Sequence, residues 1–204
     1  PRGVVARAAR SVVVLGLEQL EPVRRVGEAT AVEIEVTGID WNFSPTIAVA
    51  QDDRWGRTYE SYSEDPAIVA PLGAALVEGL QGRKGDPNRL GAGHVIATAK
   101  HFFGDGGTDQ GVDQGEVTGD IEAWKAIHAA PYPATIDAGV VTLAPTSLEL
   151  NGNRIDLDDL RGQLGGVADP LIEPILAGGQ FCIAEALPVG LTEQSVDVRD
   201  RELV

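Results

Sequence analysis

The sequence predicts an α/β protein whose strands and helices form a short or incomplete (β/α) barrel of the TIM type. Short apolar runs rich in β-branched residues alternate with longer segments in which apolar residues recur every three or four positions. Such alternation implies crossover connections and therefore a parallel sheet. About six strand–helix units fit into the 204 residues, whereas a closed eight-stranded barrel normally needs about 250. We therefore expect residues 1–204 to form one domain that falls short of a full barrel.

The first part of the chain is expected to contain two strands around one helix. Residues 12–17 are an apolar run and predict the first strand. Pro22 suits the first turn of the following helix, and Gly38 suits its end. Residues 39–43 predict the second strand. The apolar face of the helix is expected to carry Val23, Val26, Thr30 and Ile34.

The next helix has the clearest boundaries in the sequence. Asp65 followed by Pro66 is an N-cap acceptor with proline in the first turn, and Gly82 can end the helix. Its apolar side is expected to comprise Ile68, Leu72, Leu76 and Leu80. An exposed loop over residues 83–93 then leads to a buried strand over 93–99.

The remaining chain continues the alternation after a glycine-rich loop. Residues 121–128 predict a short helix, which Pro131 and Pro133 interrupt and which resumes to Asp137. Residues 140–143 predict a fourth strand. Later elements are expected at 158–164 and 171–177 (helices) and 180–184 (a strand).

Composition and charge argue against several classes of partner. The formal net charge of −15 argues against nucleic acid or an anionic membrane, because both require a basic face. The single cysteine, Cys182, excludes an internal disulfide framework and a cysteine zinc cluster, and the three histidines are far apart in sequence. We therefore expect no metal site. No apolar run approaches the ~20 residues of a membrane span.

A polar segment follows the buried strand over residues 93–99. It has the sequence KHFFGDGGT at residues 100–108. Lys100 and His101 cannot be core filler, because burying them unpaired is costly. Cationic donors, aromatic residues and a flexible turn that carries Asp105 are what a polar-ligand site in an α/β protein needs. The alternative for Lys100 and His101 is a structural role, as a strand end that is ion-paired to a neighbouring carboxylate. Phosphate binding by the glycine-rich turn is disfavoured, since no lysine–serine/threonine pair follows the glycines.

A second candidate donor, Arg57, lies between Gly56 and Thr58 in a loop that also contains Trp55. The planar fork of donors on arginine suits adjacent hydroxyl groups, and nearby aromatic rings can stack on the apolar face of a sugar. The alternative for Arg57 is a solvated loop cation. His94 and His128 are expected to be structural.

Two blocks of the sequence resemble glycoside hydrolase family 3, in its exo-β-glucanase and β-glucosidase branch. The segment KHFFGDGGT at residues 100–108 is similar to one signature of that family. Residues 40–45 (DWNFSP), together with 52–65 (DDRWGRTYESYSED), are similar to the other. The resemblance extends from about Val23 to Gly152. No Asp-Ser-His triplet follows His101, which places the resemblance on the glucose side and not with the N-acetylhexosaminidases.

The resemblance implies retaining hydrolysis of nonreducing-end β-glucosyl residues in β-glucans or cello-oligosaccharides, with no cofactor. It implies that Arg57, Lys100 and His101 bind the sugar, with Asp105 and Trp55 in the same pocket. Relatives in this family are often periplasmic or secreted, although no export signal is visible here.

The catalytic half of the family pattern is altered. Counting without gaps places Glu173 where the nucleophilic aspartate is expected, so Glu173 is the first candidate nucleophile and Asp169 the second. The family draws its acid/base glutamate from a second α/β domain, which would be a partner of this one. The alternative is a catalytically silent sugar-binding barrel, or an isolated or designed fragment without nucleophile and acid/base.

Overall fold

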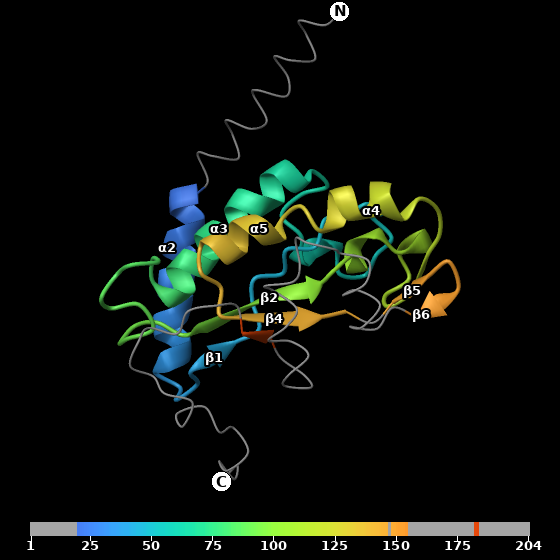
Figure 1. Cartoon of the computed structure of the whole chain (residues 1–204). Helices are drawn as coiled ribbons and strands as arrows, with labels where there is room; N and C mark the ends of the chain where they lie inside the picture. Colours follow the sequence, from blue (N-terminus) through green and yellow to red (C-terminus); the bar gives the residue numbers. More distant parts are fainter. Residues whose placement is uncertain (1–19, 147, 155–181, 184–204) are drawn as a thin grey trace, which may run out of the picture.

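The computed structural model describes residues 20–146, 148–154 and 182–183, and these form an α/β structure (Figure 1). The helices are α2 (Leu20–Glu35), α3 (Pro66–Gln81), α4 (Ile121–His128) and α5 (Tyr132–Asp137), with short 3₁₀ turns η1 (Thr58–Glu60), η2 (Asp105–Gly107) and η3 (Asp109–Gly111). The strands are β1 (Trp41–Asn42), β2 (Ile96–Phe102), β3 (Glu116–Val117), β4 (Thr142–Pro145), β5 (Glu149–Leu150), β6 (Asn153–Arg154) and β7 (Cys182–Ile183). The predicted α/β class is confirmed.

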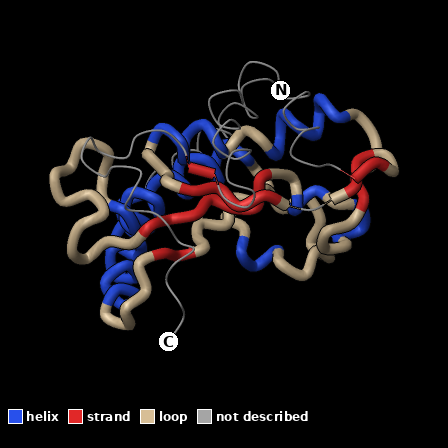
Figure 2. Tube along the Cα trace, turned by 60° about the horizontal axis from the view of Figure 1, so that its bottom comes forward, coloured by secondary structure: helices blue, strands red, loops and turns tan. Residues whose placement is uncertain are grey.

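The main sheet has the strand order β1-β2-β4-β7, and its strands run through the middle of the molecule (Figure 2). β1 pairs with β2, and β2 with β4, in parallel, as predicted. β7 pairs with β4 antiparallel, and the separate small sheet β3-β5-β6 contains an antiparallel pair, β5 with β6. The expectation of parallel strands throughout is therefore wrong at these two places. β5 and β6 are joined by a tight turn at Asn151 and Gly152, which leaves no room for a crossover helix.

The boundaries of α3 and α4 follow from local sequence. The Asp65 side chain accepts a hydrogen bond from Ala67 N at 2.9 Å, and Gly82 ends α3 with a φ of 82°. Asp120 caps α4 in the same way, through Glu122 N at 2.9 Å. Both helix assignments are confirmed, whereas the fourth strand begins at Thr142 and not at Val140.

Helices α2 and α3 pack closely because glycines meet at their crossing. A Cβ on Gly79 would lie 2.1 Å from the Arg24 carbonyl oxygen, and a Cβ on Gly27 would lie 2.9 Å from the Leu76 carbonyl oxygen. The buried residues of α2 are Gly27 and Ala31. Val26, which was expected on the buried face, is 59% exposed. Close backbone contact between small residues, and not an aliphatic stripe, holds this helix in place.

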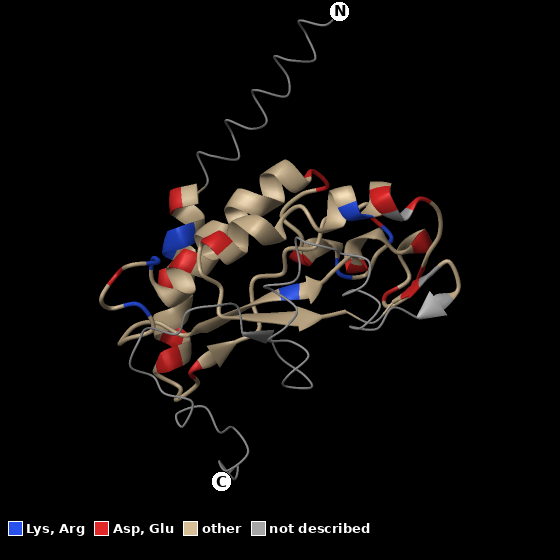
Figure 3. Ribbon diagram, in the orientation of Figure 1, with Lys and Arg blue, Asp and Glu red and all other residues tan. Residues whose placement is uncertain are grey.

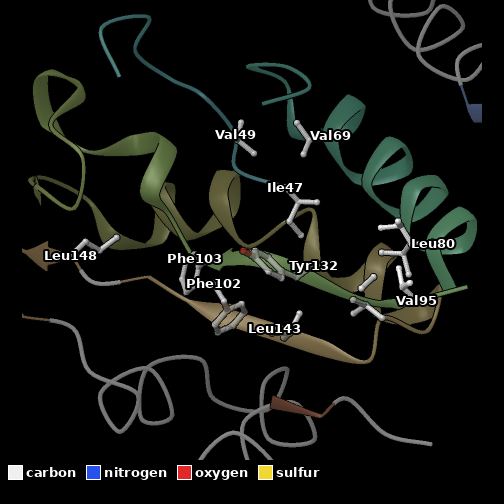
Figure 4. Packing of buried hydrophobic residues seen from close by; sticks show 14 of the residues in the cluster. Ile47, Val49, Val69, Leu80, Val95, Phe102, Phe103, Tyr132, Leu143 and Leu148 are labelled. Carbon is white, nitrogen blue, oxygen red and sulfur yellow. The ribbon is translucent and has the colours of Figure 1, made fainter. Parts of the chain in front are cut away.

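The core lies between the sheet and helices α3 and α5, which run along one face of it (Figures 1 and 4). Ile47, Val69 and Leu80 face strand residues across this layer. Phe102, Phe103 and Tyr132 extend the core with edge-on aromatic contacts, with Phe102 and Tyr132 centroids 4.7 Å apart. These side chains fix the carboxyl end of β2, where the polar segment begins.

The amino ends of β2 and β4 are joined by one fully buried side chain, Gln81. Its Oε1 accepts hydrogen bonds from Ala97 N at 3.0 Å and from Val141 N at 3.1 Å. Its Nε2 donates to the Gly139 carbonyl at 2.8 Å. The amide therefore satisfies backbone groups of two strands and one loop at once.

Several expected elements lie outside the described residues. They are the strand over 12–17, the helices over 158–164 and 171–177, and the candidate nucleophiles Glu173 and Asp169. Of the expected strand over 180–184, the structure describes Cys182 and Ile183.

Candidate functional site

Two segments far apart in sequence meet at the carboxyl end of β2. After β1 the chain continues beside β2, with Ile47 N donating to the Lys100 carbonyl at 2.8 Å and Lys100 N donating to the Pro45 carbonyl at 3.0 Å. The loop that follows leads to η1 and Arg57. Lys100 is the one lysine or arginine of β2, and Figure 3 shows Lys and Arg in blue and Asp and Glu in red along the ribbon.

Arg57 forms a two-pronged ion pair with Glu60. Arg57 Nε lies 2.7 Å from Glu60 Oε1, and Arg57 Nη2 lies 2.8 Å from Glu60 Oε2. The Thr46 hydroxyl donates to the same Oε2 at 3.0 Å. The pKa of Glu60 is lowered to about 2, first by the Arg57 hydrogen bonds, against the opposing effect of desolvation, and further by Thr46 and by the charge of Lys100. Glu60 is therefore ionised at neutral pH and holds the guanidinium in a defined plane.

His101 connects this ion pair to the glycine-rich turn. Its Nε2 lies 3.3 Å from Arg57 Nη1, and its Nδ1 lies 2.7 Å from Asp105 Oδ2. The Asp105 side chain is 3% exposed, whereas those of His101 and Arg57 are 20% and 27% exposed. The network therefore runs from a buried carboxylate to partly exposed donors.

Arg57, Lys100 and His101 thus come together in space, although 43 positions separate Arg57 from Lys100 in the sequence (100 minus 57). Arg57 contacts His101, and the Lys100 charge acts on the Glu60 carboxylate that Arg57 binds. Guanidinium and ammonium groups supply only donors, which is what a ligand with several hydroxyl oxygens requires. A role of these three residues in sugar binding stays a prediction.

Trp55 and Asp105 lie deeper than a ligand-contacting role requires. Trp55 is 2% exposed, packs with Ala48 and Ala50, and its Nε1 lies 3.2 Å from Asp113 Oδ1. Its ring is covered by protein, so the expectation that it stacks on a sugar does not fit this structure. Tyr59, in the same loop, is the exposed aromatic residue, at 84%.

Glu60 and Thr46 are the members of the network that the sequence analysis missed. Glu60 follows Arg57 by three residues, a spacing that brings side chains together on one helical turn, and this was the available signal. Nothing in the local sequence marks Thr46, because it reaches Glu60 from another segment.

The other histidines have structural surroundings. His128 is buried, and burial lowers its pKa to about 4, so the ring is neutral and packs beside Trp124 and Gly107. His94 packs against Gly82. Within residues 20–146, 148–154 and 182–183 there is no group of three or more His, Cys, Asp or Glu side chains arranged for a metal ion. Over the same part of the chain, no helix combines the length and apolarity that a membrane crossing demands.

The fold and the site together define an α/β domain with a donor-rich polar site at the carboxyl edge of its sheet. The chain belongs to glycosyl hydrolase family 3, since residues 9–159 match the N terminal domain of that family.

Known proteins of this family align with about two thirds to three quarters of this chain. The structure is similar to an exo-1,3/1,4-beta-glucanase from a Pseudoalteromonas strain, with 44% identity and a TM-score of 0.67 over 74% of this chain and 19% of that protein. The sequence is similar to a beta-xylosidase of Formosa agariphila, 34% identical over 71% of this chain and 21% of the relative. A periplasmic beta-glucosidase of Salmonella typhimurium is 30% identical over 65% of this chain and 17% of the relative. The chain thus spans about a fifth of the length of these relatives.

Proposed function

We propose that this domain binds the nonreducing-end β-glucosyl residue of a β-glucan or cello-oligosaccharide through Arg57, Lys100 and His101. The single observation that carries the proposal is the convergence of these donors around Glu60 at the carboxyl end of β2. The resemblance to an exo-glucanase at 44% identity supports a glucosyl ligand over a xylosyl one.

We further propose that the domain is the sugar-recognition part of a retaining glycoside hydrolase. Its strands would belong to a (β/α) barrel, and a second α/β domain would be its partner and supply the acid/base. Retaining hydrolysis needs two carboxyl groups about 5–5.5 Å apart. Glu60 and Asp105 are both engaged in the network, so Glu173, and after it Asp169, remains the candidate for the nucleophile.

A second candidate function is sugar binding without turnover. The observation that favours it is that the carboxylates of the described network serve other side chains: Glu60 binds Arg57, and the Asp105 side chain is buried against His101. With its pKa lowered to about 2, Glu60 cannot act as a general acid at neutral pH.

Calorimetric titration with glucose and with a gluconolactone analogue tests the binding proposal. Measurable binding that is lost in Arg57→Ala supports it, and equal binding of the two proteins contradicts it. Hydrolysis of p-nitrophenyl β-glucoside then separates the two candidates. Turnover that disappears in Glu173→Gln supports the enzyme, whereas binding without turnover supports the silent domain.

A further inference from the structure

We propose that Asp105 fixes His101 in the tautomer that carries its hydrogen on Nδ1, which leaves Nε2 as a hydrogen-bond acceptor for a donating hydroxyl of the ligand. Asp105 is then a positioning residue, because it acts through His101 and does not touch the ligand itself. The ligand class rests on the proposed function, but the tautomer does not.

The first half of the inference concerns Nδ1. It lies 2.7 Å from Asp105 Oδ2, a short distance for a hydrogen bond of this kind. The other carboxylate oxygen, Oδ1, is buried and has no hydrogen-bond partner among the described residues. An ionised carboxylate can only accept hydrogen bonds. With Asp105 as a carboxylate, Nδ1 donates, and His101 is the hydrogen-bond partner of the buried Oδ2.

The second half concerns Nε2, which faces Arg57 Nη1 at 3.3 Å. A guanidinium can only donate, so this contact is favourable when Nε2 presents its lone pair. The Asp105 carboxylate can only accept a hydrogen bond, and the Arg57 guanidinium can only donate one. The neutral tautomer with its hydrogen on Nδ1 suits both neighbours. An imidazolium would point an N–H at the guanidinium, and the Nε2–H tautomer would do the same and also leave Asp105 without a donor.

This arrangement places an acceptor beside strong donors. Arg57 uses Nε and Nη2 on Glu60, so its Nη1 group is directed to the His101 side. A hydroxyl group both accepts and donates, so one hydroxyl can receive a hydrogen bond from Arg57 and give its own to Nε2. A fluorine or an ether oxygen at the same position cannot donate. The site should therefore discriminate strongly against a sugar that lacks a hydroxyl hydrogen at one position.

The tautomer can be read directly from long-range ¹⁵N–¹H correlation spectra of the histidine rings in the ¹⁵N-labelled chain. The chain has three histidines, so the His101 signals can be assigned from their absence in His101→Gln. We expect Nδ1 to resonate as protonated and Nε2 as unprotonated nitrogen. The reverse pattern, or an averaged mixture of the two, would overturn the proposal.

A matched pair of variants tests whether Asp105 sets the tautomer. Asp105→Asn offers an amide that can donate to Nδ1, and we expect the reversed or mixed pattern. Asp109→Asn makes the same change in the same loop, where Asp109 accepts from the Thr118 hydroxyl, and should leave the His101 spectrum unchanged. An unchanged spectrum in folded Asp105→Asn refutes the role of Asp105. If that variant does not fold, the spectrum of the unaltered chain still decides the tautomer.

Methyl β-glucoside and its monodeoxyfluoro analogues test the acceptor role. At one ring position, fluorine should weaken binding about tenfold or more, because it cannot give Nε2 the hydrogen bond that the hydroxyl gives. That discrimination should fall several-fold in Asp105→Asn. If the sugar binds and no position discriminates, the acceptor role is wrong. If no sugar binds at all, the proposed function fails while the tautomer result stands on its own.

Discussion

The two ends of the parallel strands β2 and β4 are built from polar residues in opposite ways. At the amino end, the buried Gln81 amide bonds three backbone groups and leaves nothing for a ligand. At the carboxyl end, Arg57, Glu60 and His101 bond mainly to one another and remain partly exposed. A neutral amide matched to backbone groups stabilises the fold, whereas half-exposed charges held by other side chains keep donors available to a partner molecule.

The largest effect is expected at the amino end, in Gln81→Leu. The change leaves Ala97 N and Val141 N without their partner inside the core, whereas the Gly139 carbonyl keeps its hydrogen bond from Arg89 Nη2. We expect the free energy of unfolding to fall by about 3 kcal/mol or more, since each unsatisfied buried group costs about 1–3 kcal/mol. Urea unfolding followed by circular dichroism measures this. Gln51→Leu is the control, because Gln51 makes one exposed hydrogen bond, to the Glu64 carbonyl. A similar loss of unfolding free energy in both variants would contradict the special role of Gln81.

Gly79→Ala should be the next most damaging change, because Gly79 seats the helix that carries Gln81. The new Cβ would lie 2.1 Å from the Arg24 carbonyl oxygen and would push α2 away from α3. Overpacking of this kind costs about 1–3 kcal/mol, and thermal unfolding would show it as a lower Tm. Gly56→Ala, with no atom within 4 Å of the added Cβ, is the control. Equal Tm values for the two variants would contradict the close helix contact.

At the carboxyl end of the sheet, the proposed function predicts that Arg57→Ala loses affinity for the sugar and keeps most of its stability. Affinity for glucose should fall about 10-fold to 100-fold, because hydrogen bonds from a charged group contribute about 1.5–3 kcal/mol. The unfolding free energy should change by less than about 1 kcal/mol, since the pair with Glu60 is partly exposed to solvent. Arg54→Ala removes a neighbouring exposed arginine and should leave affinity unchanged. If Arg57→Ala loses stability but keeps its affinity for glucose, Arg57 has a structural role. The carboxyl end of the sheet would then not differ from the amino end in function.

The smallest predicted effect is the pH dependence that Glu60 adds to stability. Its pKa is lowered from 4.5 to about 2, so its contribution is complete above about pH 4.5 and is lost as the pH falls to about 2. We expect a contribution below about 1 kcal/mol, reduced further by salt. Acid unfolding of the unaltered chain and of Glu60→Gln should differ in slope within this window. The comparison with Glu60→Gln is needed because Asp52, whose pKa Arg54 lowers to about 2, titrates over the same range. Identical slopes of unfolding free energy against pH in the two proteins would contradict the prediction.

Local sequence was sufficient for the features that one segment determines. The cap at Asp65 and Pro66, the end at Gly82 and the helix over 121–128 all depend on neighbouring residues, and all three are confirmed. The grouping of Lys100 with His101 follows from their being adjacent. The burial of α2 was predicted less well. Periodicity selects large apolar residues such as Val26, whereas this helix is seated through Gly27 against Gly79.

The amino-acid sequence alone determined the α/β class, the helix boundaries and the family resemblance, because capping, periodicity and signature blocks are properties of short stretches. Only the tertiary structure decided that Gln81 joins two strands, that Trp55 is covered, and that Asp105 holds His101 while Glu60 holds Arg57. The physical reason is that a polar side chain takes its role from its hydrogen-bond partners. For Gln81 and the Arg57–His101 contact, those partners are 16 to 60 residues away along the chain.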